Sequence, residues 1–288
     1  MAIGLSSTLH VGQIHRLPAE RVKSLDNIAR EASVRTLWSL LFVDGYGTPA
    51  LGASFRMLWD VSKAPSYLST LPPDATNTAA VAFESHCKLV RIKQDCLDPI
   101  YSPTFQTLSW AEKEGLFLRA YTALNSFRQT IDPCLLLTRT SRPHRTQIVL
   151  WVSYHAACIS LHRRYLDPVG LQSTARSQSS LHDITAAATE ITRLLQKLAV
   201  LGELAMVPSF LAYHTLRAAL VHALNLTDEK GELRREAARG LRTCFSTLIT
   251  LRDNSWPTLS HHILCFLRST LASWELEVCM DTEAPRRI

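Results

Sequence analysis

The sequence predicts an all-α protein, a single domain of about eight or more helices packed as an irregular bundle. Apolar residues recur at three- and four-residue steps along most of the 288 residues, which is the period of one face of an α-helix. Glycine contributes only 10 residues, fewer than turn-rich β architectures need. No alternating run of apolar and polar residues is longer than about four, so no strand is expected.

The first half of the chain contains three long helical patterns. Residues 26–44 carry leucines on one side, with aromatic residues beside them. A second pattern follows Asn77 or Thr78, either of which suits the capping position before a helix. Ser109 and Glu112 form a capping box, which predicts that a third helix begins there.

The second half of the chain contains further helices separated by recognisable boundaries. Pro143 suits the first turn of a helix, Ser180 suits a cap, and Pro208 suits the start of the next apolar pattern. Trp256 and Pro257 separate the last two helical patterns from each other. These boundaries predict four or more consecutive helices up to the end of the chain.

Two stretches lack helical periodicity. Residues 45–77 are rich in proline and glycine, and residues 170–180 are rich in serine and glutamine. Both are predicted to be surface loops. Because neither has the composition of an interdomain linker, one domain over residues 1–288 is expected.

Composition excludes several classes of protein. The formal net charge is +6, from 31 basic and 25 acidic residues, which is weak evidence for nucleic-acid binding. No apolar run reaches the length of a bilayer span, and no membrane association is expected. The seven cysteines lack CxxC pairs, so reduced, mostly buried thiols are predicted rather than a zinc site.

Few residues have the spacing of a catalytic or metal site. Asp95 and Asp98 would share a helix face, but a solvated helix end explains them equally well. His261, His262 and Cys265 form the most metal-like cluster, which lacks a fourth ligand nearby. Phosphate-binding loops and the nucleophile elbow are absent. No catalytic, cofactor-binding or metal-ligating residue is therefore assigned, and no cofactor is expected.

The basic residues are dispersed along the chain, and one short stretch is a candidate DNA contact. It contains four arginines that lie off the apolar stripe of their predicted helix: Arg234, Arg235, Arg239 and Arg242. A solvated helix face explains them better than a DNA contact, because no recognition module accompanies them.

One run of residues carries a resemblance to a known family. Residues 30–31 (RE) and 35–44 (RTLWSLLFVD) resemble the RE…RRRLWWSLFVLDR signature of the fungal-specific transcription factor domain, the middle homology region of zinc binuclear cluster regulators. Residues 161–166 (LHRRYL) resemble the family's LHRP(F/Y)L helix end, and the segment from Pro208 resembles its later P.F..Y.L..A helix. The resemblance spans most of the chain in the family's order.

The residues that carry the resemblance are expected to have structural roles. They are Arg35, Leu37, Trp38, Phe42, Asp44, Gly52, Leu161, His162, Arg163 and Pro208. The run 37–42 is apolar on nearly every side, which predicts a helix buried among others. Arg35 is expected to pair with an acid of a neighbouring helix, and Asp44 needs a partner because its charge opposes the helix dipole.

The sequence also departs from the family pattern. Gly45 replaces the arginine of the LDR element, and residues 53–54 (AS) replace an Arg-Pro pair. The six-cysteine zinc cluster that binds DNA in this family does not occur. Met1 falls inside the first helix of the family pattern, so the resemblance implies a domain that is incomplete at its N-terminus.

The resemblance implies a transcription regulator located in the nucleus, one that is not an enzyme. Its expected partners are proteins, either transcription machinery or a DNA-binding regulator, and a small-molecule effector is a further candidate ligand. Sequence-specific DNA binding by this chain is not expected. The alternatives are a helical enzyme of fungal specialised metabolism that binds an apolar substrate, and a gene fragment without independent function. The enzyme would need a convergent acid or metal cluster, which the sequence does not display.

Overall fold

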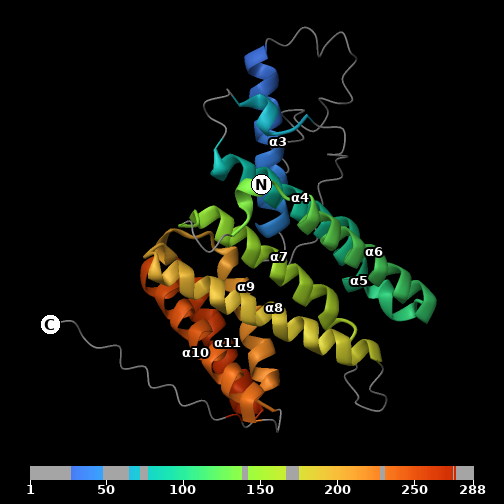
Figure 1. The fold of residues 1–288 in the computed structure, drawn as a ribbon, viewed down its shortest axis with the longest axis vertical. Coiled ribbons are helices and arrows are strands. Elements are labelled where there is room, and N and C mark those ends of the chain that lie inside the picture. The colour runs from blue at the N-terminus through green and yellow to red at the C-terminus, as the bar shows by residue number, and fades with distance from the viewer. Residues whose placement is uncertain are drawn as a thin grey trace, which may run out of the picture. The chain divides into compact units, whose positions relative to one another are not determined.

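The fold is all-α, as predicted (Figure 1). The computed structural model describes residues 27–47, 65–71, 77–137, 142–166, 175–227, 231–274 and 276. Within these ranges there is no strand, and eight of the α-helices have 15 to 26 residues. The chain divides into two compact units, residues 1–150 and 151–288, and the division falls inside helix α7 (Arg145–Arg163). The expectation of one domain stays a prediction.

The first unit is built from helices and short helical turns. Its elements are α3 (Asn27–Gly47), a 3-10 turn η4 (Leu68–Thr70), α4 (Thr78–Ile92), a π-helical turn η6 (Lys93–Leu97), α5 (Asp98–Tyr101), a 3-10 turn η7 (Pro103–Thr107), α6 (Trp110–Gln129), a 3-10 turn η8 (Pro133–Leu135) and the start of α7. The π-helical turn joins α4 to α5 without a break, so the helical path runs past the expected end at Pro99.

Two helix starts in this unit agree with the sequence prediction. The Asn77 side chain accepts hydrogen bonds from the amides of Ala79 and Ala80, at 3.0 and 3.1 Å. Ser109 and Glu112 form the predicted capping box before α6. Each cap satisfies amide groups that the first turn of a helix leaves without partners.

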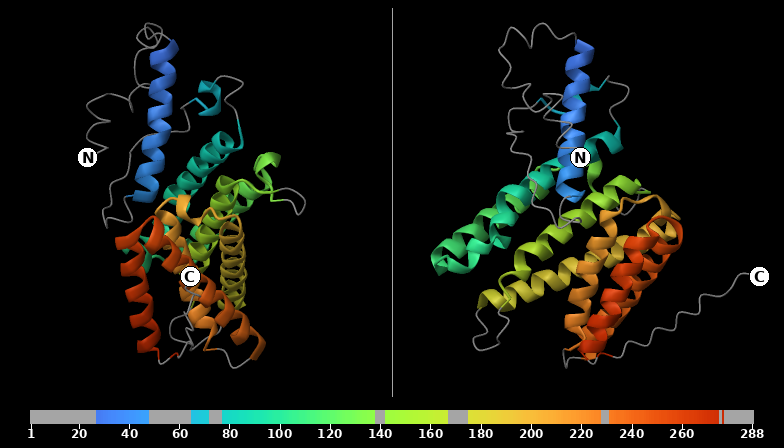
Figure 2. Two further views of the ribbon diagram at one scale, coloured as in Figure 1. Left: turned by 90° about the vertical axis from the view of Figure 1, so that its left-hand side faces the viewer. Right: turned by 180° about the vertical axis from the view of Figure 1, so that it is seen from behind.

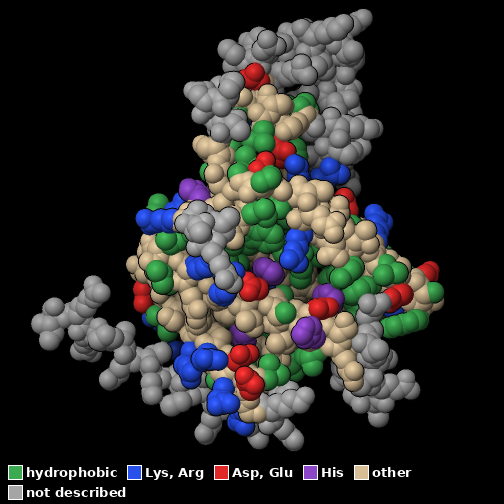
Figure 3. Space-filling view, in the orientation of Figure 1, with side chains coloured by type: hydrophobic (Ala, Val, Ile, Leu, Met, Phe, Trp, Pro, Cys, Tyr) green, Lys and Arg blue, Asp and Glu red, His purple; other side chains and the backbone are tan. Residues whose placement is uncertain are grey.

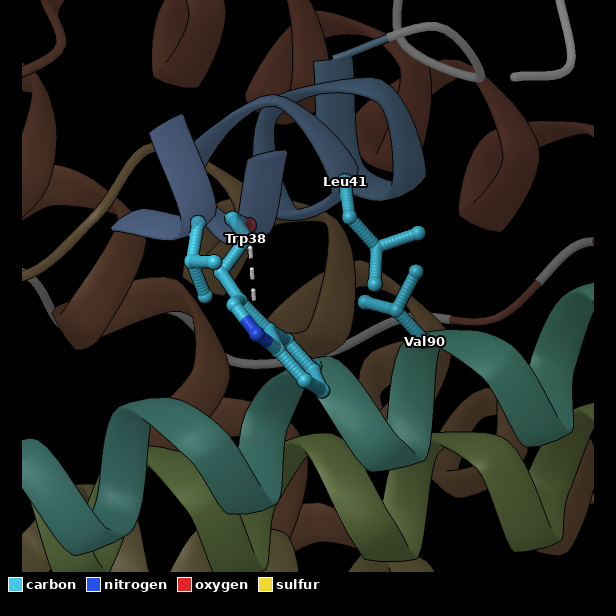
Figure 4. Packing of buried hydrophobic residues seen from close by; sticks show 5 residues of the cluster. Trp38, Leu41 and Val90 are labelled. Carbon is cyan, nitrogen blue, oxygen red and sulfur yellow. Dashed lines mark hydrogen bonds between the residues drawn. The ribbon is translucent and has the colours of Figure 1, made fainter. Parts of the chain in front are cut away.

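One core cluster of the first unit lies between α3 and α4. It is a cluster of five buried residues: Val34, Trp38, Leu41, Cys87 and Val90. Figure 4 shows Trp38 and Leu41 pointing from α3 toward α4, with Leu41 facing Val90. Gly45, in the last turn of α3, lies so close to Val90 that a β-carbon there would collide with the valine side chain. Gly45, which stands where the resembled signature has an arginine, therefore permits close packing of α3 on α4.

The second unit is a bundle of long helices. It contains the rest of α7, then α8 (Ala175–Val200), a 3-10 turn η9 (Leu204–Met206), α9 (Phe210–Asn225), α10 (Gly231–Asn254) and α11 (Pro257–Ser273). Helices α9, α10 and α11 pack side by side, and α8 crosses α9 and α10 (Figures 1 and 2). Their shared core is almost wholly aliphatic, with Ile191, Leu194, Leu195, Leu211, Leu241, Leu248, Leu251 and Leu267 fully enclosed.

Some boundaries in this unit differ from the prediction. Helix α8 begins at Ala175, so Ser180 lies inside the helix and is not its cap. The same observation contradicts the loop expected over residues 170–180, because its second half is helical. Helices α7 and α9 begin two residues after Pro143 and Pro208. The break before Pro257 is confirmed, since α11 begins at that residue.

Candidate functional site

The residues at the centre of the family resemblance lie on α3 and form part of the core. Trp38 is 5% exposed, which confirms its predicted burial. Its indole Nε1 donates a hydrogen bond to the carbonyl oxygen of Pro65 at 3.0 Å. Its own carbonyl oxygen lies 3.6 Å from Cys87 Sγ, which donates to it from α4 (Figure 4). Trp38 therefore joins α3 both to α4 and to the segment that contains Pro65.

A buried carboxylate on α4 fixes the same segment. Glu84 accepts hydrogen bonds from Ser66 Oγ at 2.5 Å and from the Leu68 amide at 3.0 Å, and Lys88 Nζ lies 2.9 Å away. Burial raises the pKa of Glu84, but the hydrogen bonds from Ser66, Lys88 and Leu68 outweigh burial and hold that pKa below its usual range. Glu84 is thus ionised and clamps the turn beside Trp38.

The other signature residues of α3 have different environments. Arg35 pairs with Glu31 of its own helix, with 3.7 Å between Nη2 and Oε2, so the expected partner on a neighbouring helix is wrong. Leu37 is buried, as predicted. Phe42 is half-buried among the aromatic and histidine rings of the cluster, which are those of Tyr46, Phe83 and His86. The side chain of Asp44, and Gly52, lie outside the described residues.

The remaining signature residues lie in the second unit. Leu161 and His162 are buried near the end of α7, whereas Arg163 is exposed. Pro208 is half-buried just before α9. The residue before it, Val207, accepts a hydrogen bond at 2.9 Å from the indole of a tryptophan at the α10–α11 corner. The structural roles expected of these signature residues stay a prediction.

The environment of His162 contains the three residue types of a serine-hydrolase triad but not its geometry. His162 Nδ1 lies 3.3 Å from Ser180 Oγ and 3.5 Å from Asp183 Oδ2. In a catalytic triad the serine and the carboxylate contact opposite ring nitrogens: one nitrogen accepts the serine proton, and the other donates to the carboxylate, which orients the ring and stabilises its charged form. Here both contact the same nitrogen, and Ser180 is wholly buried. The arrangement joins α7 to α8 and does not form a nucleophile.

Two other histidines are buried in the neutral form. Burial lowers the pKa of His86 to about 4, although its hydrogen bonds to the backbone of Ala82 and Val149 act in the opposite direction. Burial likewise lowers the pKa of His222 to about 4, against a hydrogen bond to the backbone of Ala188. Both rings are packed inside their units and serve as polar parts of the core.

The metal-like cluster of the sequence is partly assembled. Cys265 Sγ and His261 Nε2 lie 3.6 Å apart on α11, and the His262 ring centre is 6.1 Å from that of His261. Among the described residues no three His, Cys, Asp or Glu side chains converge on one point as metal ligands would. Asp95 lies 3.9 Å from Arg91, an ion pair one turn apart on the same helical path.

The four arginines of α10 are all exposed, as predicted for a solvated face. Arg239 Nη2 lies 3.9 Å from a carboxylate oxygen of Glu236. At the bottom of the view in Figure 3, blue Lys and Arg side chains lie beside red Asp and Glu side chains. They do not form one continuous basic stripe in that part of the view. No helix in the described ranges has the length and apolarity needed to cross a bilayer.

Helix α6 exposes apolar side chains that sequence reasoning missed. Trp110 is 61% exposed at the start of the helix, and Leu118 is half-exposed two turns later. Tyr121 is also exposed, and its ring stacks on that of Phe117 with 5.9 Å between the ring centres. The two residues are four positions apart, and periodicity alone does not distinguish the centre of an apolar stripe from its edge.

Comparison of the chain with protein-family models, with curated proteins and with solved structures finds no match.

Proposed function

We propose that this chain is a regulatory helical domain of a fungal zinc-cluster type transcription regulator, which acts in the nucleus through protein contacts. The observation that carries the proposal is the run 35–44, whose residues resemble the family signature and lie on α3, the helix that supplies Trp38 to the core. The signature consists mainly of residues that pack in the core and has no group of reactive side chains. Such a signature suits a domain that binds other proteins through its surface rather than one that catalyses a reaction.

The buried ionisable groups join structural elements to one another, which favours a binding role over the alternative of a helical enzyme. Glu84 and His162, two buried ionisable groups, tie a turn and a pair of helices together. The apolar side chains exposed on α6, such as Leu118, suit contact with another protein, because partners commonly cover apolar surface of this kind.

A tethering experiment tests the proposal. The whole chain is fused to an unrelated DNA-binding domain, and transcription is measured from a reporter that carries that domain's binding site. We expect a change in transcription relative to the DNA-binding domain alone, because a regulatory domain recruits or blocks its partners wherever it is placed. An unchanged reporter, with the fusion folded and equally abundant, would refute a regulatory role.

Two surface variants sharpen this experiment. Leu118→Ser removes an apolar side chain from the exposed face of α6, and Leu136→Ser removes a similarly exposed leucine beside η8. If α6 contacts the partner, Leu118→Ser reduces the reporter response and Leu136→Ser does not. If Leu118→Ser reduces the reporter response no more than Leu136→Ser does, the partner contact lies elsewhere on the chain.

A further inference from the structure

The outer face of α11 carries a thiol and an imidazole at a fixed separation. His261 and Cys265 are one helical turn apart and both exposed, and their atoms Nε2 and Sγ lie 3.6 Å apart. A cysteine is among the residues most often buried, so its presence on a solvated helix face is uncommon. The opposite face of α11 is anchored in the core through Leu264 and Leu267, which fixes the backbone that carries the pair.

The separation of the two atoms equals the ligand spacing of a tetrahedral zinc site. Zinc binds thiolate sulfur at about 2.3 Å and imidazole nitrogen at about 2.0–2.1 Å, and a tetrahedral angle between such bonds sets the ligand atoms about 3.5–3.6 Å apart. A cation placed between Cys265 Sγ and His261 Nε2 therefore needs no change in their distance. We propose that His261 and Cys265 form a bidentate surface site for a divalent cation of the zinc class.

The residue types favour this class of cation over magnesium or calcium. Thiolate and imidazole are ligands for zinc and similar transition metals, whereas magnesium and calcium prefer oxygen. On binding, the thiol of Cys265 loses its proton to solvent and its sulfur becomes the ligand, while neutral His261 donates the lone pair of Nε2. No electron is transferred, so the site needs neither an oxidant nor a reductant.

Two tetrahedral positions of the bound cation are left for other ligands. Either water fills them, or the same pair from a second copy of the chain does. The number of cations per chain at saturation distinguishes these arrangements: one indicates water, and one for every two chains indicates a second copy. Phe266, half-exposed next to Cys265, would lie at the junction of two copies.

Cobalt absorption tests the site on the whole chain. Co²⁺ replaces Zn²⁺ in such sites and gives a near-ultraviolet band only when a thiolate binds it. Titration of the reduced protein with Co²⁺ should produce this band, and Zn²⁺ should displace it. Cys265→Ser should abolish the band, and His261→Gln should weaken Co²⁺ affinity at least about tenfold, because each removes one of two protein ligands.

A second exposed cysteine supplies the matched control. Cys134 lies within η8, close to Asp132, and burial together with that carboxylate raises the pKa of its thiol to about 11, which disfavours the thiolate. Cys134→Ser should leave the cobalt band and affinity unchanged. The proposal is overturned if the band persists in Cys265→Ser, is lost in Cys134→Ser, or keeps its affinity in His261→Gln. Circular dichroism verifies that the exposed substitutions leave the fold intact.

Discussion

At the scale of single residues, Trp38 connects the most parts of the first unit. It fills the space between α3 and α4 and donates its indole hydrogen bond to the turn at Pro65. We expect Trp38→Ala to lower the free energy of unfolding by about 3–5 kcal/mol, because it removes a large buried ring and leaves a cavity. Urea or thermal unfolding of the purified variant measures this.

An exposed tryptophan serves as the comparison for that variant. Trp110→Ala removes the same side chain from a position that is 61% exposed, so its cost should be about 0.5 kcal/mol or less. A Trp38→Ala cost as small as that of Trp110→Ala would contradict the packing of α3 on α4.

The buried histidines predict sensitivity to mild acid. His86 and His222 have pKa values of about 4 in the folded protein, lowered from 6.5, so the unfolded chain binds more protons between those values. The contribution of these two neutral histidines to the free energy of unfolding is therefore fully present above pH 6.5 and is lost as pH falls toward 4. The loss is about 2 kcal/mol per histidine between pH 7 and pH 5. Urea unfolding at the two pH values measures the difference.

A substitution assigns that effect to its source. His222→Gln should remove about half of the difference between pH 7 and pH 5, whatever its own cost to stability at pH 7. His262→Gln alters an exposed ring and should remove none of it. Stability that is the same at both pH values in the parent protein would show that the two rings are accessible to protons in the folded state.

At the scale of elements, one carboxylate determines whether the 3-10 turn η4 is held against α4. Glu84→Ala would remove the acceptor of the Leu68 amide and of the Ser66 hydroxyl. We expect faster hydrogen exchange at Leu68 and a cost of about 1–3 kcal/mol, the usual range for leaving a buried polar group unsatisfied. Exchange mass spectrometry resolves the turn from the rest of the unit.

The partner of that carboxylate provides the control. Lys88 is largely exposed, and an exposed ion pair contributes about 1 kcal/mol or less. Lys88→Ala should therefore leave the exchange of Leu68 slow. Fast exchange in Lys88→Ala would mean that the lysine, rather than the hydrogen bonds to the backbone, positions Glu84.

The helices were predictable where their signals are local. The capping groups at Asn77 and Ser109 act on amides within three residues, so their role is visible in the sequence. Ser180 resembles them, but its hydroxyl contacts His162, which is 18 positions away. Glu84 likewise bonds a segment 16 to 18 residues earlier, across a stretch without periodicity. Such contacts depend on tertiary packing, which local patterns do not encode.

The candidate site was predictable in part for the same reason. His261 and Cys265 are four residues apart, and on a helix that spacing brings side chains together without help from the rest of the fold. The partner of Arg35 also follows from spacing within one helix, since Glu31 lies four residues earlier on α3, whereas the expected partner was an acid of a neighbouring helix.

At the scale of the whole molecule, the dispersed positive charge limits the interaction with DNA. The net charge of +6 is spread over 288 residues, and on α10 Arg239 pairs with Glu236. We expect micromolar or weaker binding to duplex DNA at near-physiological salt, with no sequence preference and a steep decrease with added salt. Fluorescence anisotropy with two unrelated duplexes measures this, and nanomolar, selective binding to one of them would contradict it.

The π-helical turn between α4 and α5 has a consequence for how the chain tolerates insertions and deletions. A π-helical turn contains one residue more than the α-helix around it. Deleting Gln94 from it would restore a regular α-helix without opening a gap. Because the deletion removes only the extra residue, the later residues of the helix keep their faces and Ile100 stays in the core. A one-residue alignment gap at this point would thus mark a relative that keeps the packing of α5, whereas the same gap in a regular stretch of the helix would rotate every later residue by about 100°.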